Sequence, residues 1–241
     1  MKSKKHSKSS EKKKFGGADS LFDKRAVSLI VIAGLLVLFN QFQISGISGQ
    51  LGYGGSGSLK VVSASEISEI KSTAQAIATL FPVGDIRSEE DAIAIMIAQG
   101  TPEYGESMGI SYDDPVGGMT LLASNYNAVK KDIQQNYPEV WERYLNLATK
   151  PVGISCEFCC GVGPVGITKT GDLRCGCQHN PAVQSLTMLL MKDTDYDDAQ
   201  ILQEVIKWKT LFYPRDMVGL AMQVSGGELD AGNLPGMVGG C

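Results

Sequence analysis

Cysteines are concentrated in one short stretch of this chain. Five of the six cysteines lie between positions 156 and 179, together with one of the two histidines. The residues of this stretch are Cys156, Cys159, Cys160, Cys175, Cys177 and His179. Thiolate and imidazole groups at this density are typical ligands of soft or borderline metal ions. The segment 155–180 therefore predicts a metal site, although the same thiols could instead form a redox relay or disulfides.

The two halves of the segment resemble a zinc ribbon. The first half is Cys156-x-x-Cys159 with Cys160 adjacent, and the second is Cys175-x-Cys177 with His179 close behind. Residues 165–174 between them alternate loosely and contain a Thr-Gly turn signal, which predicts a short hairpin. In a zinc ribbon, such a hairpin brings two tight turns together around one tetrahedral ion. A ribbon normally has CxxC in both halves, so the ligand set stays open, and zinc, copper(I) and an iron–sulfur cluster all fit these residue types.

Structural disulfides are a second use for the same thiols. Thiols that face an oxidising compartment commonly pair, and pairs here would cross between the two halves because adjacent Cys159 and Cys160 seldom bond to each other. One of the five cysteines would then lack a local partner, for which Cys241 is the candidate. In this alternative, the cysteine segment only stabilises the fold through disulfide cross-links.

Thiol exchange is a third use, and it would involve Cys175 and Cys177. Exchange needs a thiolate, and two features favour one at Cys177: a helix that begins near Pro181, and the neighbouring Arg174 or His179. The stretch from Leu173 to Pro214 also resembles the small helical thiol-oxidoreductase domain of cytochrome c maturation. It is similar as well to cysteine-rich, membrane-anchored bacterial and archaeal proteins. The first resemblance implies that the Cys175-x-Cys177 pair exchanges thiols, although that family has CxxC.

The N-terminus predicts a membrane anchor. Residues 1–25 contain eight lysines and one arginine against three acidic residues, a net charge of +6. Residues 26–47 carry no charge and are mostly apolar, and about 20 such residues suffice for a helix to cross a bilayer. The basic flank predicts a cytoplasmic N-terminus and an extracytoplasmic remainder. A cleaved signal peptide and a pilin-type leader remain as alternatives.

This topology divides the chain into five parts. Residues 1–25 are expected to form a basic cytoplasmic tail, 26–47 a single-pass transmembrane helix, and 48–58 a Gly/Ser linker. Residues 59–230 form the predicted extracytoplasmic domain, which carries the cysteine-rich hairpin insertion, and 231–241 form a flexible tail. The expected partners are the membrane and other membrane or envelope proteins.

Helical periodicity runs through most of the predicted domain, so we expect a mainly α fold. Ser63 to Glu66 fits a capping box that opens a helix reaching Phe81, and Ser88 opens a second helix that would form an antiparallel hairpin with the first. Residues 101–118 lack periodicity and are expected to be irregular. Further helices are predicted over 119–133, 140–147, 180–191 and 197–213, with Pro214 ending the last.

Other classes of function lack their motifs. The sequence has no nucleophile-elbow pattern, no haem-attachment CxxCH, no phosphate-binding loop and no dinucleotide fingerprint. We therefore expect no nucleotide or nucleic-acid partner. The sequence favours a membrane-anchored, extracytoplasmic metal-binding protein with a structural or metal-handling role. A tethered thiol-disulfide oxidoreductase and a disulfide-stapled surface or filament protein are the alternatives.

Overall fold

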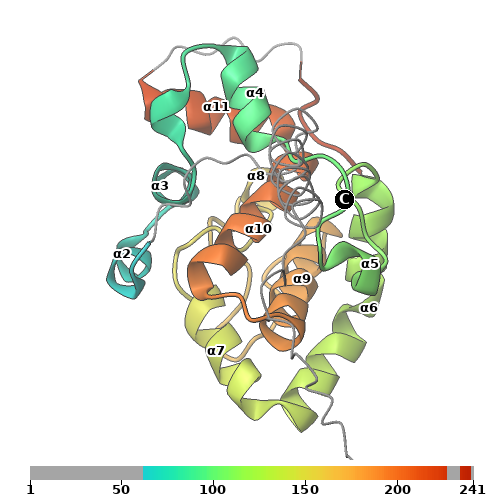
Figure 1. Ribbon diagram of the computed structural model, residues 1–241. Coiled ribbons are helices and arrows are strands. Elements are labelled where there is room, and N and C mark those ends of the chain that lie inside the picture. The colour runs from blue at the N-terminus through green and yellow to red at the C-terminus, as the bar shows by residue number, and fades with distance from the viewer. Residues whose placement is uncertain (1–61, 227–233, 240–241) are drawn as a thin grey trace, which may run out of the picture. The chain divides into compact units, whose positions relative to one another are not determined.

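The computed structural model describes residues 62–226 and 234–239 (Figure 1). All of them belong to the second of two contact units, Gly55–Cys241. The predicted tail 1–25, transmembrane helix 26–47 and linker 48–58 lie outside the described residues, as does Cys241. Within the described ranges, none of the helices has both the length and the apolar character needed to cross a bilayer.

The described part of the chain is mainly helical, as the sequence predicts, and it contains no strand longer than an isolated bridge. Its helices are α2 Ala64–Glu69, α3 Thr73–Leu80, α4 Glu89–Met96, α5 Gly105–Met108, α6 Pro115–Asn136, α7 Pro138–Ala148, α8 Glu157–Cys160, α9 His179–Asp193, α10 Asp198–Phe212 and α11 Pro214–Ser225, with a 3-10 turn at Val83–Asp85.

Helices α9 and α10 form the centre of the fold. Helix α9 packs against α6, α7 and α10, and α10 also packs against α3 and α11 (Figure 1). Both are buried on most sides, because apolar residues such as Leu186 and Trp208 and polar residues such as Gln184 and Lys209 are all inaccessible to solvent. Helices that are buried nearly all round form the core, and their polar side chains must find partners there. The cysteine-rich segment lies directly before α9 in the chain, so the core fixes its second half.

Side-chain caps set several helix starts, as the sequence indicates. Ser63 and Glu66 form the predicted capping box at α2, and Asp197 forms another with Gln200 at α10. The prediction of one helix from Ser63 to Phe81 is wrong, however. Ile70 is extended and ends α2, and the Ser72 side chain caps a new helix, α3. A second serine cap within an otherwise periodic run ended the first helix early.

The arrangement of the early helices also differs from the prediction. Helices α3 and α4 do not form a hairpin on each other, because both pack mainly against α11. Helix α11 itself was not predicted. Pro214 ends α10 as expected, but it also occupies the first turn of α11, where its missing N–H costs nothing.

Helix α6 begins earlier than predicted. The region 101–118 was expected to be irregular, yet α5 lies within it and α6 starts at Pro115, capped by Asp114 through the Gly117 N–H. At Gly118, a Cβ atom would lie 2.7 Å from the Trp208 ring. Glycine there lets α6 cross close over α10, which is why a glycine-rich sequence is helical at this point.

Candidate metal centre

Four cysteine sulfurs meet at one point of the fold. The Sγ atoms of Cys156, Cys160, Cys175 and Cys177 all lie within 4.8 Å of one another. The Sγ atom of Cys156 is 2.9 Å from that of Cys177 and 3.6 Å from that of Cys175, and Cys175 and Cys177 are 3.3 Å apart. Tetrahedral zinc with bonds of about 2.3 Å places its sulfurs about 3.8 Å apart. The four sulfurs, here called the tetrad, thus have the spacing of ligands to one ion.

The first half of the tetrad is built by a single helical turn. Cys156 is the N-cap of α8 and Cys160 is its last residue, so the two are four positions apart and lie on the same face. Gly161 ends the turn in the left-handed conformation, with φ of 63°. The turn is tied back by Ser155, whose Oγ donates to the Gly163 carbonyl at 2.5 Å.

A short hairpin joins the two halves, where the sequence predicts one. Ile167 and Leu173 form an antiparallel bridge, and the Thr168 N–H donates to the Asp172 carbonyl at 2.8 Å. The Arg174 N–H donates to the Gly166 carbonyl at 2.9 Å. Only isolated bridges form, so this is a hairpin without regular strands. It places Cys175 opposite the first turn.

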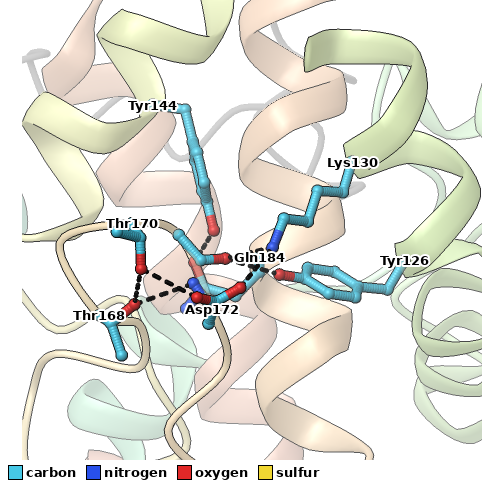
Figure 2. Close-up of polar contacts among 8 residues, drawn as sticks. Tyr126, Lys130, Tyr144, Thr168, Thr170, Asp172 and Gln184 are labelled. Carbon is cyan, nitrogen blue, oxygen red and sulfur yellow. Dashed lines mark hydrogen bonds and ion pairs between the residues drawn. The ribbon is translucent and has the colours of Figure 1, made fainter. Parts of the chain in front are cut away.

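Helix α6 holds the tip of this hairpin (Figure 2). The Lys130 ammonium donates to the Gly171 carbonyl at 2.9 Å and pairs with the Asp172 carboxylate at 3.1 Å. The Tyr126 hydroxyl donates to the same carbonyl at 3.2 Å. Hydrogen bonds from Thr170 and then from Lys130 lower the pKa of Asp172. The hairpin tip is therefore fixed to a helix outside the cysteine segment.

Two buried amides of α9 tie both halves of the segment together. Gln184 Nε2 donates to the Ile154 carbonyl at 2.8 Å, and its Oε1 accepts from the Tyr144 hydroxyl at 2.9 Å (Figure 2). Asn180 Nδ2 donates to the Gly166 carbonyl at 2.9 Å and to the Cys175 carbonyl at 3.4 Å. Sequence reasoning missed these two residues. Their spacing of four along an apolar helix face was the available signal, because buried amides need partners.

The second half of the tetrad lies at the start of α9, and this placement favours a thiolate at Cys177. The pKa of Cys177 is lowered to about 3 by hydrogen bonds from the Cys156 thiol, from His179 and from the Asn180 backbone N–H. The sequence pointed to the helix start and to His179, and both contribute. Arg174 does not, since its guanidinium donates to the Val165 carbonyl instead.

The thiols of Cys156 and Cys160 resist ionisation because a negative charge already resides beside them. Hydrogen bonding to Cys177 and burial raise the pKa of Cys156, and hydrogen bonding to Cys175 together with the cysteine charges raises that of Cys160 to about 11. Without a bound cation, the tetrad thus disfavours having several of its thiols ionised at the same time. A bound cation reverses this preference, because its charge stabilises every thiolate around it.

His179 lies beside the tetrad but is not one of the four. Its ring is fully buried against Phe212 and Tyr213, with ring centres 5.3 Å and 4.8 Å away. Nε2 lies 2.9 Å from the Val238 carbonyl oxygen, which can only accept, so Nε2 carries a proton. Nδ1 has no hydrogen-bond partner. The His179 side chain nevertheless contributes to the lowered pKa of Cys177.

Two more buried groups surround the tetrad. The Tyr213 hydroxyl is buried without a hydrogen-bond partner, and burial followed by the four cysteine charges raises the pKa of Tyr213. Lys209 is fully buried, and its ammonium donates to the Glu157 carboxylate at 2.8 Å and to Thr73 Oγ1 at 3.1 Å. Burial lowers the pKa of Lys209, and Glu157 opposes this effect.

Cys159, the remaining predicted ligand, lies on the same turn but outside the tetrad. Its Sγ is 3.5 Å from that of Cys160. Cys156, Cys160, Cys175 and Cys177 are all free thiols, so the disulfides expected between the two halves do not form among these four. Sequence comparison with protein-family models and with curated proteins, and structural comparison with solved structures, find no match to this chain.

Proposed function

We propose that the tetrad binds a single zinc ion, and that this centre joins the cysteine-rich segment to the helical core. The observation that carries the proposal is the meeting of four sulfurs, from two segments 15 or more residues apart, within 4.8 Å. Tetrahedral sites with four sulfur ligands favour zinc or iron. A [4Fe–4S] cluster holds each thiolate on a different iron, and a [2Fe–2S] cluster divides the four thiolates between two irons. Both need wider spacing than a single ion, so the compact tetrad favours one ion. Zinc is preferred to copper(I) because all four sulfurs are available together.

The buried polar groups around the tetrad support an occupied centre. Groups that are buried without partners are costly, and both His179 Nδ1 and the Tyr213 hydroxyl are in this state beside the sulfurs. Four thiolates around Zn²⁺ carry a net charge of about −2, and their sulfurs accept hydrogen bonds. Metal binding would thus give the Tyr213 hydroxyl, which can donate, an acceptor. The ammonium of Lys209 lies behind the first half, where it would offset part of the negative charge.

The closed arrangement supports a structural or metal-handling role over hydrolytic chemistry. A catalytic zinc site keeps one position for water or substrate, with three protein ligands. Here four ligands of one kind converge, which is the composition of structural sites. When bound, the ion would cross-link α8, the hairpin and the start of α9. The residues 26–47 would anchor this domain at the outer face of a membrane, where other envelope proteins are the expected partners.

Metal analysis of the full-length chain tests this proposal. The chain would be purified anaerobically without chelator, and its metal content measured by elemental analysis beside a count of reactive thiols. We expect about one zinc per chain, with most thiols reacting only after a chelator is added. Cys156→Ser should abolish binding, whereas Cys159→Ser, on the same turn but outside the tetrad, should retain the metal. A metal-free wild-type chain under these conditions would refute the proposal.

Thiol-disulfide exchange remains a second candidate because of one observation. Cys177 is strongly acidic, and its sulfur lies 3.3 Å from that of Cys175. Acidic thiols are typical of exchange catalysts. Both sulfurs are buried, however, and a partner protein would have to reach them. Reduction of a model disulfide by the metal-free chain, lost in Cys177→Ser and unaffected by a chelator, would favour this function over the metal site.

A further inference from the structure

The four sulfurs of the tetrad are not equally accessible. Cys156, Cys175 and Cys177 are 1%, 8% and 6% exposed, whereas Cys160 is exposed. Three ligands therefore face the core and one faces solvent. Any molecule that approaches the metal from outside meets the Cys160 sulfur first.

The loop that follows Cys160 is open to solvent on its outer side, although Ser155 ties it back through the Gly163 carbonyl. Cys160 ends α8 and precedes Gly161 and Gly163, which have φ of 63° and 72°. A Cβ atom added to either glycine would meet nothing within 4 Å, so this loop is open on its outer side. Glycine is conformationally permissive, and an exposed side chain beside two glycines can move without displacing the core.

The three buried ligands are held much more firmly. Cys156 is followed by Glu157, whose carboxylate pairs with the buried Lys209, and Cys175 is held by Asn180 through its carbonyl. The Asn180 backbone N–H also hydrogen-bonds Cys177. Displacing the segments that carry these three residues would disturb buried interactions, and none of those interactions involves Cys160. The contrast divides the tetrad into a fixed group of three and one displaceable ligand.

We infer that Cys160 is the exchangeable ligand, through which the metal is transferred to and from small thiols or a thiol-bearing acceptor. This inference rests on the proposed zinc site and assigns it a metal-handling role. In the exchange, an incoming thiol gives its proton to the Cys160 thiolate as its own sulfur binds zinc. The zinc keeps four sulfur ligands and its charge throughout, and no oxidation occurs. The three buried thiolates retain the ion until further thiols or a chelator remove it.

The test uses the full-length chain loaded with Co²⁺ or Zn²⁺, with Cys160→Ser and Cys156→Ser as a matched pair from the same turn. With Co²⁺, we expect Cys160→Ser to keep one ion and lose one of the four sulfur-to-cobalt charge-transfer contributions. With Zn²⁺, it should release the ion to a chromogenic chelator at least about tenfold faster than wild type. Cys156→Ser should bind neither ion. In the wild-type chain, millimolar glutathione should accelerate zinc release in proportion to its concentration.

The possible results distinguish failure of the exchange role of Cys160 from failure of the zinc site itself. Complete loss of metal in Cys160→Ser, or a wild-type release rate that glutathione does not change, overturns the exchange role while leaving the zinc site intact. A wild-type chain that binds no metal overturns the zinc site itself and the exchange role with it. Circular dichroism of both variants checks the helical fold, and the glutathione dependence of the wild type gives a result that needs no variant.

Discussion

The Lys209 ammonium lies 2.8 Å from the Glu157 carboxylate, at a point where the lysine side chain is entirely removed from solvent. The two residues come from the last turn of α10 and from the turn that carries Cys156 and Cys160. Lys209 also donates to Thr73 Oγ1 and to the Gly153 carbonyl. This one side chain therefore links α3, the core and the first half of the tetrad.

Removing the lysine charge should be strongly destabilising. Lys209→Met leaves Glu157 in a mostly buried position without its cation, and breaking such a pair costs about 3–5 kcal/mol of unfolding free energy. Urea denaturation at fixed zinc concentration measures the loss. Lys192→Met is the control, since its ion pairs to Asp132 and Asp193 are longer and partly exposed, and it should cost about 1 kcal/mol or less. Equal costs for the two variants would contradict the assigned role of Lys209.

His179 should control the acidity of Cys177. In the metal-free chain, His179→Asn removes one of the hydrogen bonds that hold the Cys177 pKa near 3, so that pKa should rise by about one pH unit or more. Thiolate absorbance measured against pH reports the change. Arg174→Gln is the matched control, because its guanidinium bonds the Val165 carbonyl rather than a thiol. If Arg174→Gln raised the pKa of Cys177 as much as His179→Asn does, the effect would come from the loss of nearby positive charge and not from the His179 hydrogen bond.

The hairpin tip depends on a glycine at position 171. Gly171 has φ of 81°, and a Cβ there would overlap the Trp141 ring. Gly171→Ala should therefore destabilise the chain by at least about 1–2 kcal/mol, from backbone strain alone. Gly176→Ala is the control, because it has ordinary φ and open space although it lies between Cys175 and Cys177. Thermal denaturation compares the two, and similar melting temperatures would show that the tip tolerates a side chain.

A second buried polar network should be sensitive to one hydroxyl. The Tyr104 hydroxyl donates to the Glu204 carboxylate at 2.8 Å and accepts from Trp208 Nε1 at 2.9 Å, and Tyr112 donates to the same carboxylate. Tyr104→Phe leaves the indole N–H without its acceptor and should cost about 1–3 kcal/mol in urea denaturation. Thr120→Ala, at an exposed hydrogen bond of α6, should change stability by about 0.5 kcal/mol or less. A neutral Tyr104→Phe would mean that water replaces the hydroxyl.

The sequence was sufficient to predict the helical class and the location of the cysteine centre. Helical periodicity and serine or aspartate caps are local signals, and cysteine density needs no tertiary information. The sequence could not show whether Cys159 or Cys160 joins the tetrad, since CxxC spacing suggests that Cys156 pairs with Cys159 as a ligand. Only the helical turn of α8, which places positions four apart on one face, brings Cys160 to the tetrad.

Long-range partners explain the other differences. Lys209 and Glu157 are 52 residues apart, and Glu204 and Tyr104 are 100 apart, so no local pattern reveals that these polar groups are buried and satisfied. The glycines in the first turn of α6 suggest a loop from sequence alone. The reason for Gly118 is the close approach of Trp208, which lies on another helix. Tertiary packing overrides local propensity at each of these positions.

Metal binding should release protons and weaken as the pH falls. Before binding, Cys177 is already ionised near neutral pH because its pKa is about 3, whereas Cys156 and Cys160 are protonated because theirs are raised, that of Cys160 to about 11. Zinc binds thiolates, so each bound ion must displace at least the two protons of Cys156 and Cys160. Protons and metal compete for these sulfurs, and the affinity should therefore fall with decreasing pH. Calorimetry at pH 7 in buffers of different ionisation enthalpy counts the protons, and His179→Asn should not lower the count. Release of no protons would mean that the thiols are ionised without metal, which would contradict the charge distribution assigned to the tetrad.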